Sequence, residues 1–220
     1  LDICPKELNE NEVKQNLSLD SSKVKNRIVN DMFQKCIKSR PSPIYNKKFL
    51  DRIKLGNFED DIDKINEVDW IIEVVVEKLD IKKSVFDMVE KHRKTGTIIT
   101  SNTSGIPIKL MNEGRSDDFK ECFAITHFFN PPRYLNLFEV VPGPDCKKEI
   151  LDFLLYYGEK FLGKTSVLAK DTPAFIGNRI GIFGIMSLFH QIKNGEYSVE
   201  EVDKLTGPAI GRPKSATFRT

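Results

Sequence analysis

The stretch Asp69-Trp70-Ile71-Ile72-Glu73-Val74-Val75-Val76-Glu77 carries the strongest structural signal in this chain of 220 residues. β-Branched residues dominate it, and few polar residues interrupt them. Such a run is typical of a parallel strand that is buried on both faces of a sheet. The segments that follow it determine which kind of sheet the strand belongs to.

Strands and helices alternate after this first strand. A helical pattern covers Leu79–His92, and a short buried strand covers Thr97–Thr100. A short helix over Ile106–Met111 leads into a third strand over Cys122–His127. Strand, helix, strand, helix and strand at this spacing predict an α/β fold with a doubly wound sheet.

The pattern changes after the third strand. Asn130-Pro131-Pro132-Arg133 is a turn signal, and the next strand, Leu137–Val141, follows too soon for a helical crossover. Parallel strands need a long connection, whereas antiparallel strands do not. We therefore expect an antiparallel hairpin here.

The outer segments complete the expected organisation. Before the sheet we expect a helix over Ser22–Ile37 and a short strand over Arg52–Leu55; after the hairpin we expect a helix over Lys147–Phe161, a strand over Ser166–Ala169 and a long apolar helix over Pro173–Lys193. The sheet pattern ends near Lys170–Pro173. We expect one domain over residues 1–171 and the start of a helical domain over residues 172–220.

The composition excludes several classes of protein. The 34 Lys and Arg nearly balance the 32 Asp and Glu, for a net charge of +2, which gives no reason to expect a nucleic-acid partner. No apolar run reaches the ~20 residues that span a bilayer, so we expect no membrane partner. The four cysteines lie far apart and form no metal-binding pattern, so we expect no metal. Reduced thiols favour a cytoplasmic location.

Three polar clusters follow predicted strands: Ser101–Ser104, His127–Pro131 and Lys170–Arg179. Open α/β sheets bind ligands at the carboxyl ends of their strands. The clusters could equally be turn and cap residues. In the third cluster, Asp171 or Thr172 would then cap a helix with Pro173 at its first position.

His127 and Glu139 form the most specific candidate pair. His127 ends a predicted buried strand, and Glu139 lies among apolar residues in the middle of the next one. A hairpin centred near Arg133 would bring the two alongside each other. A buried carboxylate costs free energy unless it is paired, so His127 is a sensible partner, and the pair would form a general base. Alternatively, Glu139 pairs with another cation and His127 fills a gap in the core.

These motifs together resemble the NAD-dependent L-3-hydroxyacyl-CoA dehydrogenases. The resemblance rests on Ser101-Asn102-Thr103-Ser104, on His127-Phe128-Phe129-Asn130-Pro131 with Glu139 twelve residues on, and on Lys170-Asp171-Thr172-Pro173 followed by Phe175, Asn178 and Arg179. It covers essentially the whole chain. The longer strings His127–Tyr134 and Gly211–Ala216 are similar to a bacterial branch in which this unit is often fused to an enoyl-CoA hydratase.

The resemblance implies an N-terminally truncated Rossmann-like sheet and a reaction of fatty-acid β-oxidation: a 3-hydroxyacyl-CoA becomes a 3-ketoacyl-CoA, and hydride passes to NAD. It implies that His127 is the catalytic base and Glu139 its orienting carboxylate. Ser104 and Asn178 would hydrogen-bond the substrate oxygen, with Ser104 also near the nicotinamide.

The resemblance also implies cofactor and substrate contacts. Glu77, Lys82 and Asn130 match cofactor-contacting positions. Asp2 falls where the family ends its second strand with the acid that binds the adenosine ribose and favours NAD over NADP. Lys48 is a candidate for binding the phosphates of CoA, although a solvated helix face explains most of the neighbouring lysines.

One departure from the family is the missing first strand with its GxGxxG loop, which would seat the pyrophosphate on a helix N-terminus. The chain therefore resembles an internal fragment of a longer enzyme, a homodimer when complete. We expect it to bind NAD more weakly than an N-terminally extended version would, and to self-associate through the helix Pro173–Lys193. The alternatives are an inactive fragment, a non-catalytic binding protein that retains the fold, and a dehydrogenase acting on a free hydroxyacid.

Overall fold

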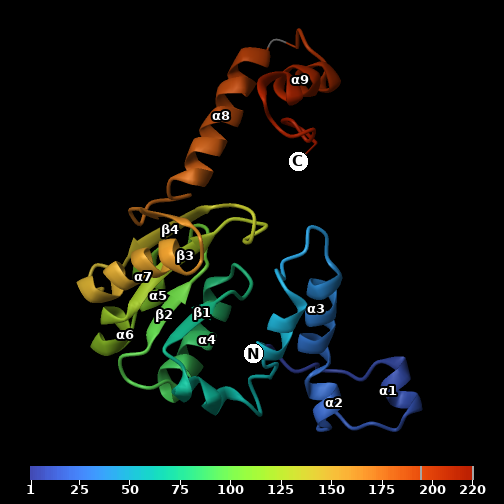
Figure 1. The fold of residues 1–220 in the computed structure, drawn as a ribbon, viewed down its shortest axis with the longest axis vertical. Coiled ribbons are helices and arrows are strands. Elements are labelled where there is room, and N and C mark those ends of the chain that lie inside the picture. The colour runs from blue at the N-terminus through green and yellow to red at the C-terminus, as the bar shows by residue number, and fades with distance from the viewer. Residues whose placement is uncertain (194, 220) are drawn as a thin grey trace. The chain divides into compact units, whose positions relative to one another are not determined.

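The computed structural model describes residues 1–193 and 195–219, which form two compact units. The first unit is Leu1–Pro173 and contains the sheet; the second is Ala174–Thr220 and is helical. Figure 1 shows the sheet of the first unit with its helices, and the helices α8 and α9 of the second unit in orange and red.

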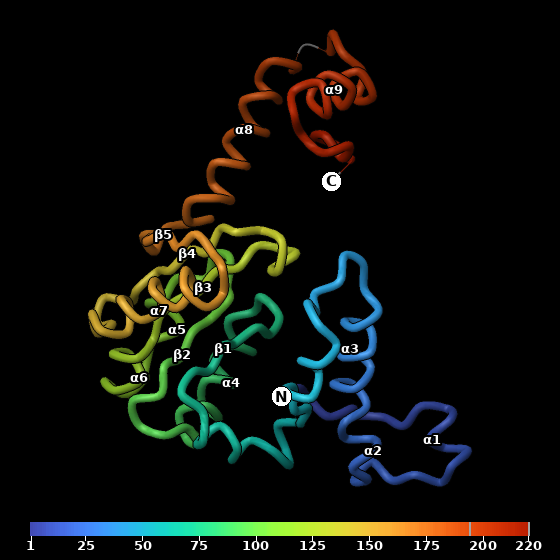
Figure 2. Tube along the Cα trace, in the orientation of Figure 1, coloured from blue at the N-terminus to red at the C-terminus, as the bar shows by residue number. Residues whose placement is uncertain are grey.

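The sheet of the first unit has five strands in the order β1-β2-β3-β4-β5. They are β1 (Trp70–Glu73), β2 (Ile98–Ser101), β3 (Phe123–Phe128), β4 (Leu137–Pro142) and β5 (Thr165–Leu168). The first three are parallel, β4 runs antiparallel to β3, and β5 is parallel to β4 (Figure 2). This topology confirms the predicted α/β fold and the predicted antiparallel hairpin.

Helices cover both faces of the sheet. The helices are α4 (Leu79–His92) between β1 and β2, α5 (Ile108–Asn112) and α6 (Asp117–Glu121) between β2 and β3, and α7 (Lys148–Lys160) between β4 and β5. On one face, Phe86 of α4 and Phe119 of α6 pack with Phe123, and their ring centroids lie 5.3–5.6 Å apart. Side chains of successive strand residues point to opposite faces. Accordingly, Ala124 packs on the other face with Leu154 of α7.

The N-terminal part of the first unit is helical and differs from the prediction in two places. It contains α1 (Glu10–Lys14), α2 (Ser22–Lys25), α3 (Arg27–Lys38) and the 3₁₀ helices η1 (Lys47–Arg52) and η2 (Ile62–Glu67). The single helix expected over Ser22–Ile37 is broken at Asn26, whose side-chain amide donates to the backbone oxygen of Ser22. An Asn side chain competes in this way with the backbone hydrogen bonds of a helix.

The strand expected over Arg52–Leu55 was wrong. Arg52 instead ends η1, whose first turn is capped by the Asn46 side chain, which accepts from the backbone N–H of Lys48. The extended pairing in this region is a single parallel bridge between Asp2 and Asn57.

The second unit contains α8 (Gly177–Ile192), α9 (Val199–Thr206) and η3 (Pro208–Ile210). The long helix expected from Pro173 begins later, at Gly177, so the alternative in which Asp171 or Thr172 caps a helix starting at Pro173 was wrong. Asp171 instead accepts a 2.9 Å hydrogen bond from the backbone N–H of Ile108 at the start of α5. Across residues 1–193 and 195–219, no helix is both long enough and apolar enough to cross a membrane.

The closest approach between α7 and the sheet occurs at Gly158. A Cβ at this position would lie 2.4 Å from Ser166 Oγ and 2.7 Å from Phe138 Cδ1. We expect Gly158→Ala to destabilise the protein by about 1–3 kcal/mol, the usual cost of overpacking a core. Gly181 of α8 is the control, because an added Cβ there meets no atom within 4 Å among the described residues. Urea unfolding of both alanine variants checks this; equal stabilities would contradict it.

Candidate active site

The candidate site lies where the three parallel strands end. Glu73 ends β1, Ser101 ends β2, and His127 is the penultimate residue of β3. The carboxyl ends of parallel strands share one edge of a sheet, and polar side chains gathered there form the usual ligand site of an open α/β fold.

His127 and Glu139 face each other across the β3–β4 hairpin. They are register partners, so their side chains lie on the same face of the sheet. His127 Nδ1 lies 2.6 Å from Glu139 Oε2, and the two residues are 5% and 0% exposed. The ring of Phe129 packs edge-on against the imidazole at 4.6 Å between centroids. The hairpin thus has the geometry that the spacing of the two residues predicted, and it fixes the orientation of the imidazole.

The loop after β2 joins the ends of all three parallel strands. Asn102 donates from its backbone N–H to the carbonyl of Glu73 at 2.8 Å. Its side-chain oxygen accepts from the backbone N–H of Phe128, the neighbour of His127, at 2.9 Å. Ser104 lies two residues further along this loop and is exposed. The loop therefore holds Ser104 in a fixed relation to β1 and β3.

Glu77 and Lys82 are bonded to each other. Their Oε2 and Nζ atoms lie 3.2 Å apart, and Lys82 Nζ also bonds both carboxylate oxygens of Glu73, at 2.9 and 3.0 Å. The Lys82 side chain is 1% exposed, whereas that of Glu77 is 44% exposed. Of Glu77 and Lys82, which were both predicted to contact the cofactor, only Glu77 therefore presents its charged end to the surface.

The environment of Glu77 keeps its carboxylate ionised. Burial by itself raises the pKa of this carboxyl. Hydrogen bonds from the Thr103 hydroxyl and the Ser104 backbone N–H, together with the charge of Lys82, outweigh that effect and leave the pKa below its ordinary value of 4.5. An ionised Glu77 can accept hydrogen bonds from a ligand.

The remaining predicted residues lie in several places. Asp2 pairs with Asn57 in the isolated bridge, and its carboxylate accepts from the backbone N–H of Ile3. Lys48 is exposed on η1, and Asn130 is exposed directly after β3. Asn178 lies in the first turn of α8, in the second unit. Its place beside the substrate oxygen stays a prediction.

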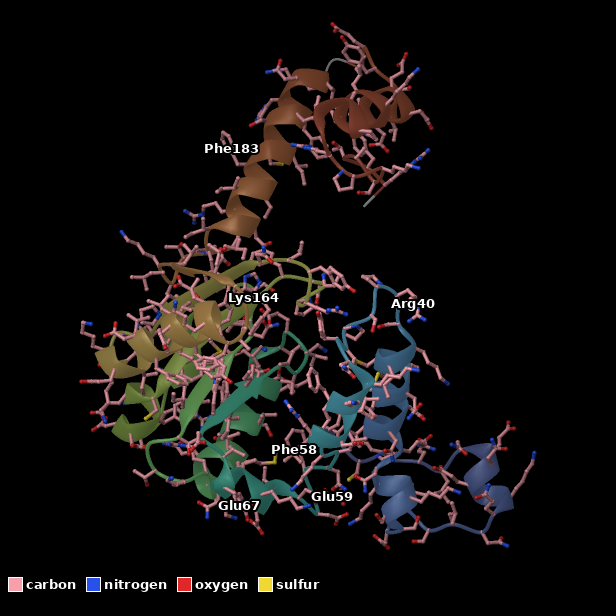
Figure 3. The ribbon with its side chains drawn as sticks, in the orientation of Figure 1. Arg40, Phe58, Glu59, Glu67, Lys164 and Phe183 are labelled. Carbon is pink, nitrogen blue, oxygen red and sulfur yellow. The ribbon has the colours of Figure 1, made fainter. Side chains whose placement is uncertain are left out.

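The segment after Asn130 is anchored on two sides. Arg133 donates to the backbone oxygen of Ser42 at 2.8 Å and to that of Ile44 at 3.2 Å. On the other side, Lys164, labelled in Figure 3, donates to the Leu135 carbonyl at 2.7 Å, and burial lowers the pKa of its ammonium. These contacts fix the turn that connects His127 to Glu139.

Sequence reasoning missed Glu73, and it named Ser101, Asn102 and Thr103 only as members of a polar cluster, without individual roles. Glu73, Ser101 and Thr103 are buried and hydrogen-bonded to one another or to the predicted residues, and Asn102 joins the strands. Glu73 carried a signal, since it is a carboxylate in an otherwise apolar run that was predicted to be a buried strand. The prediction of burial on both faces was wrong, because β1 is the first strand in the sheet order and Ile72 is 41% exposed. No pattern in the sequence shows which cation it pairs with.

A comparison with known protein families gives one match that covers most of the chain. The model for the 3-hydroxyacyl-CoA dehydrogenase, NAD binding domain, matches residues 11–172. That range includes His127 and Glu139, Ser104, and the paired Glu77 and Lys82.

Two relatives illustrate the similarity in sequence. A Bacillus subtilis protein named a probable 3-hydroxyacyl-CoA dehydrogenase is 52% identical over 220 residues, which is 100% of this chain and 28% of that protein. A Rickettsia felis protein, whose name describes a trifunctional enzyme of a fatty acid oxidation complex, is 36% identical over 88% of this chain and 27% of its own length. The chain thus spans little more than a quarter of the length of each relative.

A solved structure shows the same fold. The structure of (S)-3-hydroxybutyryl-CoA dehydrogenase PaaH1 from Ralstonia eutropha has a TM-score of 0.68 and 25% sequence identity to this chain. The similarity covers 88% of this chain and 68% of the other, and it extends to the Rossmann-type, mostly parallel sheet.

The lowered pKa of Glu77 makes a prediction about stability and pH. A carboxylate with a depressed pKa stabilises the folded state above its ordinary pKa, and this contribution is lost as the pH falls through the lower folded value. We expect Glu77→Gln to be less stable than the wild type at about pH 7, and we expect this difference in stability to shrink as the pH is lowered from about 7 to about 3. Urea unfolding at both pH values measures the difference, and a constant difference would contradict the assignment.

Proposed function

Because this chain belongs to the NAD-binding domain family of the 3-hydroxyacyl-CoA dehydrogenases, we propose that the protein oxidises a 3-hydroxyacyl-CoA to the 3-ketoacyl-CoA with NAD as the hydride acceptor. This reaction is a step of fatty-acid β-oxidation. The observation that carries the proposal is the buried 2.6 Å contact between His127 and Glu139 at the end of β3.

His127 acts as the general base in this proposal. Oxidising a secondary alcohol requires the hydroxyl proton to leave as hydride departs, and NAD, when bound, accepts that hydride. Glu139 is bonded to Nδ1, so the proposal assigns the incoming proton to Nε2. Glu139 holds the ring in one tautomer and stabilises the imidazolium that forms, as a buried carboxylate does for the His of a hydrolase triad.

The polar groups at the strand ends suit a dinucleotide. Glu77 presents a half-exposed, ionised carboxylate at the end of β1, which is a suitable acceptor for ribose hydroxyls. We assign Glu77 and Asn130 as contacts to NAD and Asp2 as the contact to its adenosine ribose. Lys82 takes part through Glu77, to which its ammonium is bonded.

Three residues are assigned to the substrate. Ser104 and Asn178 are proposed to hydrogen-bond the oxygen that is oxidised, and exposed Lys48 to bind a phosphate of the acyl-CoA. In this assignment, residues 1–171 form the cofactor domain, and residues 172–220 begin a helical domain for substrate binding and dimerisation.

The whole protein is proposed to be cytoplasmic and to carry further parts. The trifunctional Rickettsia relative supports fusion to further enzyme domains, and the small share of these two relatives that this chain covers is consistent with it. We propose that one such domain is an enoyl-CoA hydratase. Mass spectrometry of the natural protein, together with a hydratase assay, distinguishes a fused enzyme from a separate dehydrogenase.

The His127–Glu139 pair makes the principal prediction about activity. In the whole protein, His127→Ala should lower kcat by roughly 10²–10⁴-fold, the usual value of general acid–base catalysis. Glu139→Gln should lower kcat less and should move the pH–rate profile, because the imidazole loses its anionic neighbour.

His92→Ala is the matched control for this experiment. His92 also contacts a carboxylate, with its Nδ1 2.6 Å from Asp63 Oδ1, but it lies at the far end of α4. The His92→Ala variant should have the same kcat as the wild type. Unchanged turnover in His127→Ala would refute the assignment, and a wild-type protein without turnover would favour the non-catalytic alternative.

The apolar surface of α8 makes a prediction about assembly. Ile180, Phe183 and Met186 are 66%, 73% and 48% exposed, and Figure 3 labels Phe183 on this helix. Exposed apolar side chains grouped on one helix usually mark an interface, and we propose that α8 contributes to a homodimer. Phe183→Glu should weaken self-association at least about tenfold.

Gln191→Glu adds the same charge to an exposed position near the end of α8 and should leave self-association unchanged. Sedimentation equilibrium of both variants makes the comparison. If Phe183→Glu and the wild type have the same association constant, α8 does not form the interface.

A further inference from the structure

Six polar residues at the ends of β1 and β2 form a hydrogen-bonded network, which we call the ring. Five of them close a cycle, and the sixth, Ser104, is joined to Glu77 by its backbone N–H; the six are Glu73, Glu77, Lys82, Ser101, Thr103 and Ser104. We propose that Glu73, through this ring, is a positioning residue of the active site: it holds Lys82 and Ser101, which in turn fix Glu77 and the backbone of Ser104. The proposal deepens the proposed function and rests on it for the roles of Glu77 and Ser104.

Glu73 is the centre of the ring because each of its oxygens accepts two hydrogen bonds. Oε1 accepts from Lys82 Nζ at 2.9 Å and from the backbone N–H of Val75 at 2.5 Å. Oε2 accepts from Lys82 Nζ at 3.0 Å and from the Ser101 hydroxyl at 2.5 Å. Because the Glu73 carboxylate is 3% exposed and both of its oxygens are hydrogen-bonded, its side chain is held in a single orientation.

Two paths lead from Glu73 to the surface of the site. Lys82 bonds Glu77, whose other oxygen accepts from the backbone N–H of Ser104 at 2.9 Å. Ser101 accepts from the backbone N–H of Thr103 at 3.2 Å, and the Thr103 hydroxyl donates to Glu77. Both paths end at Glu77 and Ser104, which are the members of the ring that reach the surface.

The stability of the fold does not account for this arrangement. Lys82 lies in the first turn of α4, close to the positive end of the helix dipole, where a cation is unfavourable. Its ammonium is also almost completely removed from water, which costs free energy that an apolar pair of similar size would avoid. A buried ion pair that adds little stability can still select one geometry, and here that geometry is the one of Glu77 and Ser104.

The charges of the ring are unequal. Two carboxylates share a single ammonium, so the ring has one negative charge in excess. Replacing Glu73 by Gln removes that excess charge, and it also removes an acceptor from Lys82 and from Ser101.

The test compares Glu73→Gln with Glu90→Gln in the whole protein. Glu90 is the matched control because it is also a carboxylate that bonds a buried cation. It lies on α4 and accepts hydrogen bonds from Arg115 at 3.2 Å and from the Ser116 backbone N–H at 2.8 Å, away from the ring. In Glu73→Gln, we expect amide hydrogen exchange at Ser104 to speed up roughly tenfold and the Kd for NAD to rise roughly tenfold. In Glu90→Gln, both values should remain those of the wild type.

Equal exchange rates at Ser104 in the two variants would overturn the proposal. If Glu73→Gln fails to fold, Ser101→Ala replaces it, since that variant removes only the hydroxyl that joins Glu73 to the Thr103 backbone. Ser101→Ala should also speed up amide exchange at Ser104 and raise the Kd for NAD, each by a smaller factor than Glu73→Gln. Unchanged values of both would again overturn the proposal. A wild-type protein that binds no NAD would refute the proposed function, whereas the exchange comparison would still decide the role of Glu73.

Discussion

The antiparallel pairing of β3 with β4 is the constraint on which the site depends. A parallel strand in place of β4 would have needed a crossover and could not have returned within the eight residues, 129–136, that connect β3 to β4. The hairpin makes His127 and Glu139 register partners on one face of the sheet. A shift of one residue would send Glu139 to the opposite face, so the register itself determines the contact.

The same sheet places a second set of charges at its carboxyl edge. Glu139 is completely buried and bonded to an imidazole, whereas Glu77 is half-exposed and held by an ammonium and by hydrogen-bond donors of the neighbouring loop. Their environments suit different tasks: a buried carboxylate orients a base, and a partly exposed one can accept hydrogen bonds from a ligand. The loop containing Asn102 joins these two regions, because it bonds both β1 and β3.

The cost of burying these groups explains why they are so thoroughly bonded. An unpaired charge at the end of β1 or β3 would be unstable in a sheet covered by helices on both faces. Glu73 is therefore paired with Lys82, and Glu139 with His127. The outcome is a site whose surface groups have little freedom, a property that catalysis by orientation requires.

The sequence by itself determined the α/β class, the hairpin and the pairing of His127 with Glu139, because alternation, strand length and turn residues are local properties that directly limit the topology. It did not determine that Asn26 breaks a helix, that Arg52 ends a 3₁₀ helix, or that Asp171 caps α5 instead of its own helix. Those outcomes depend on side-chain hydrogen bonds that local periodicity does not record.

Only the tertiary structure revealed the partner of Glu73. A carboxylate in an apolar strand signals that some cation must lie nearby, but Lys82 is selected by the packing of α4 against the sheet, nine residues along the chain. Burial makes the pairing obligatory, and the three-dimensional arrangement alone decides which residues satisfy it.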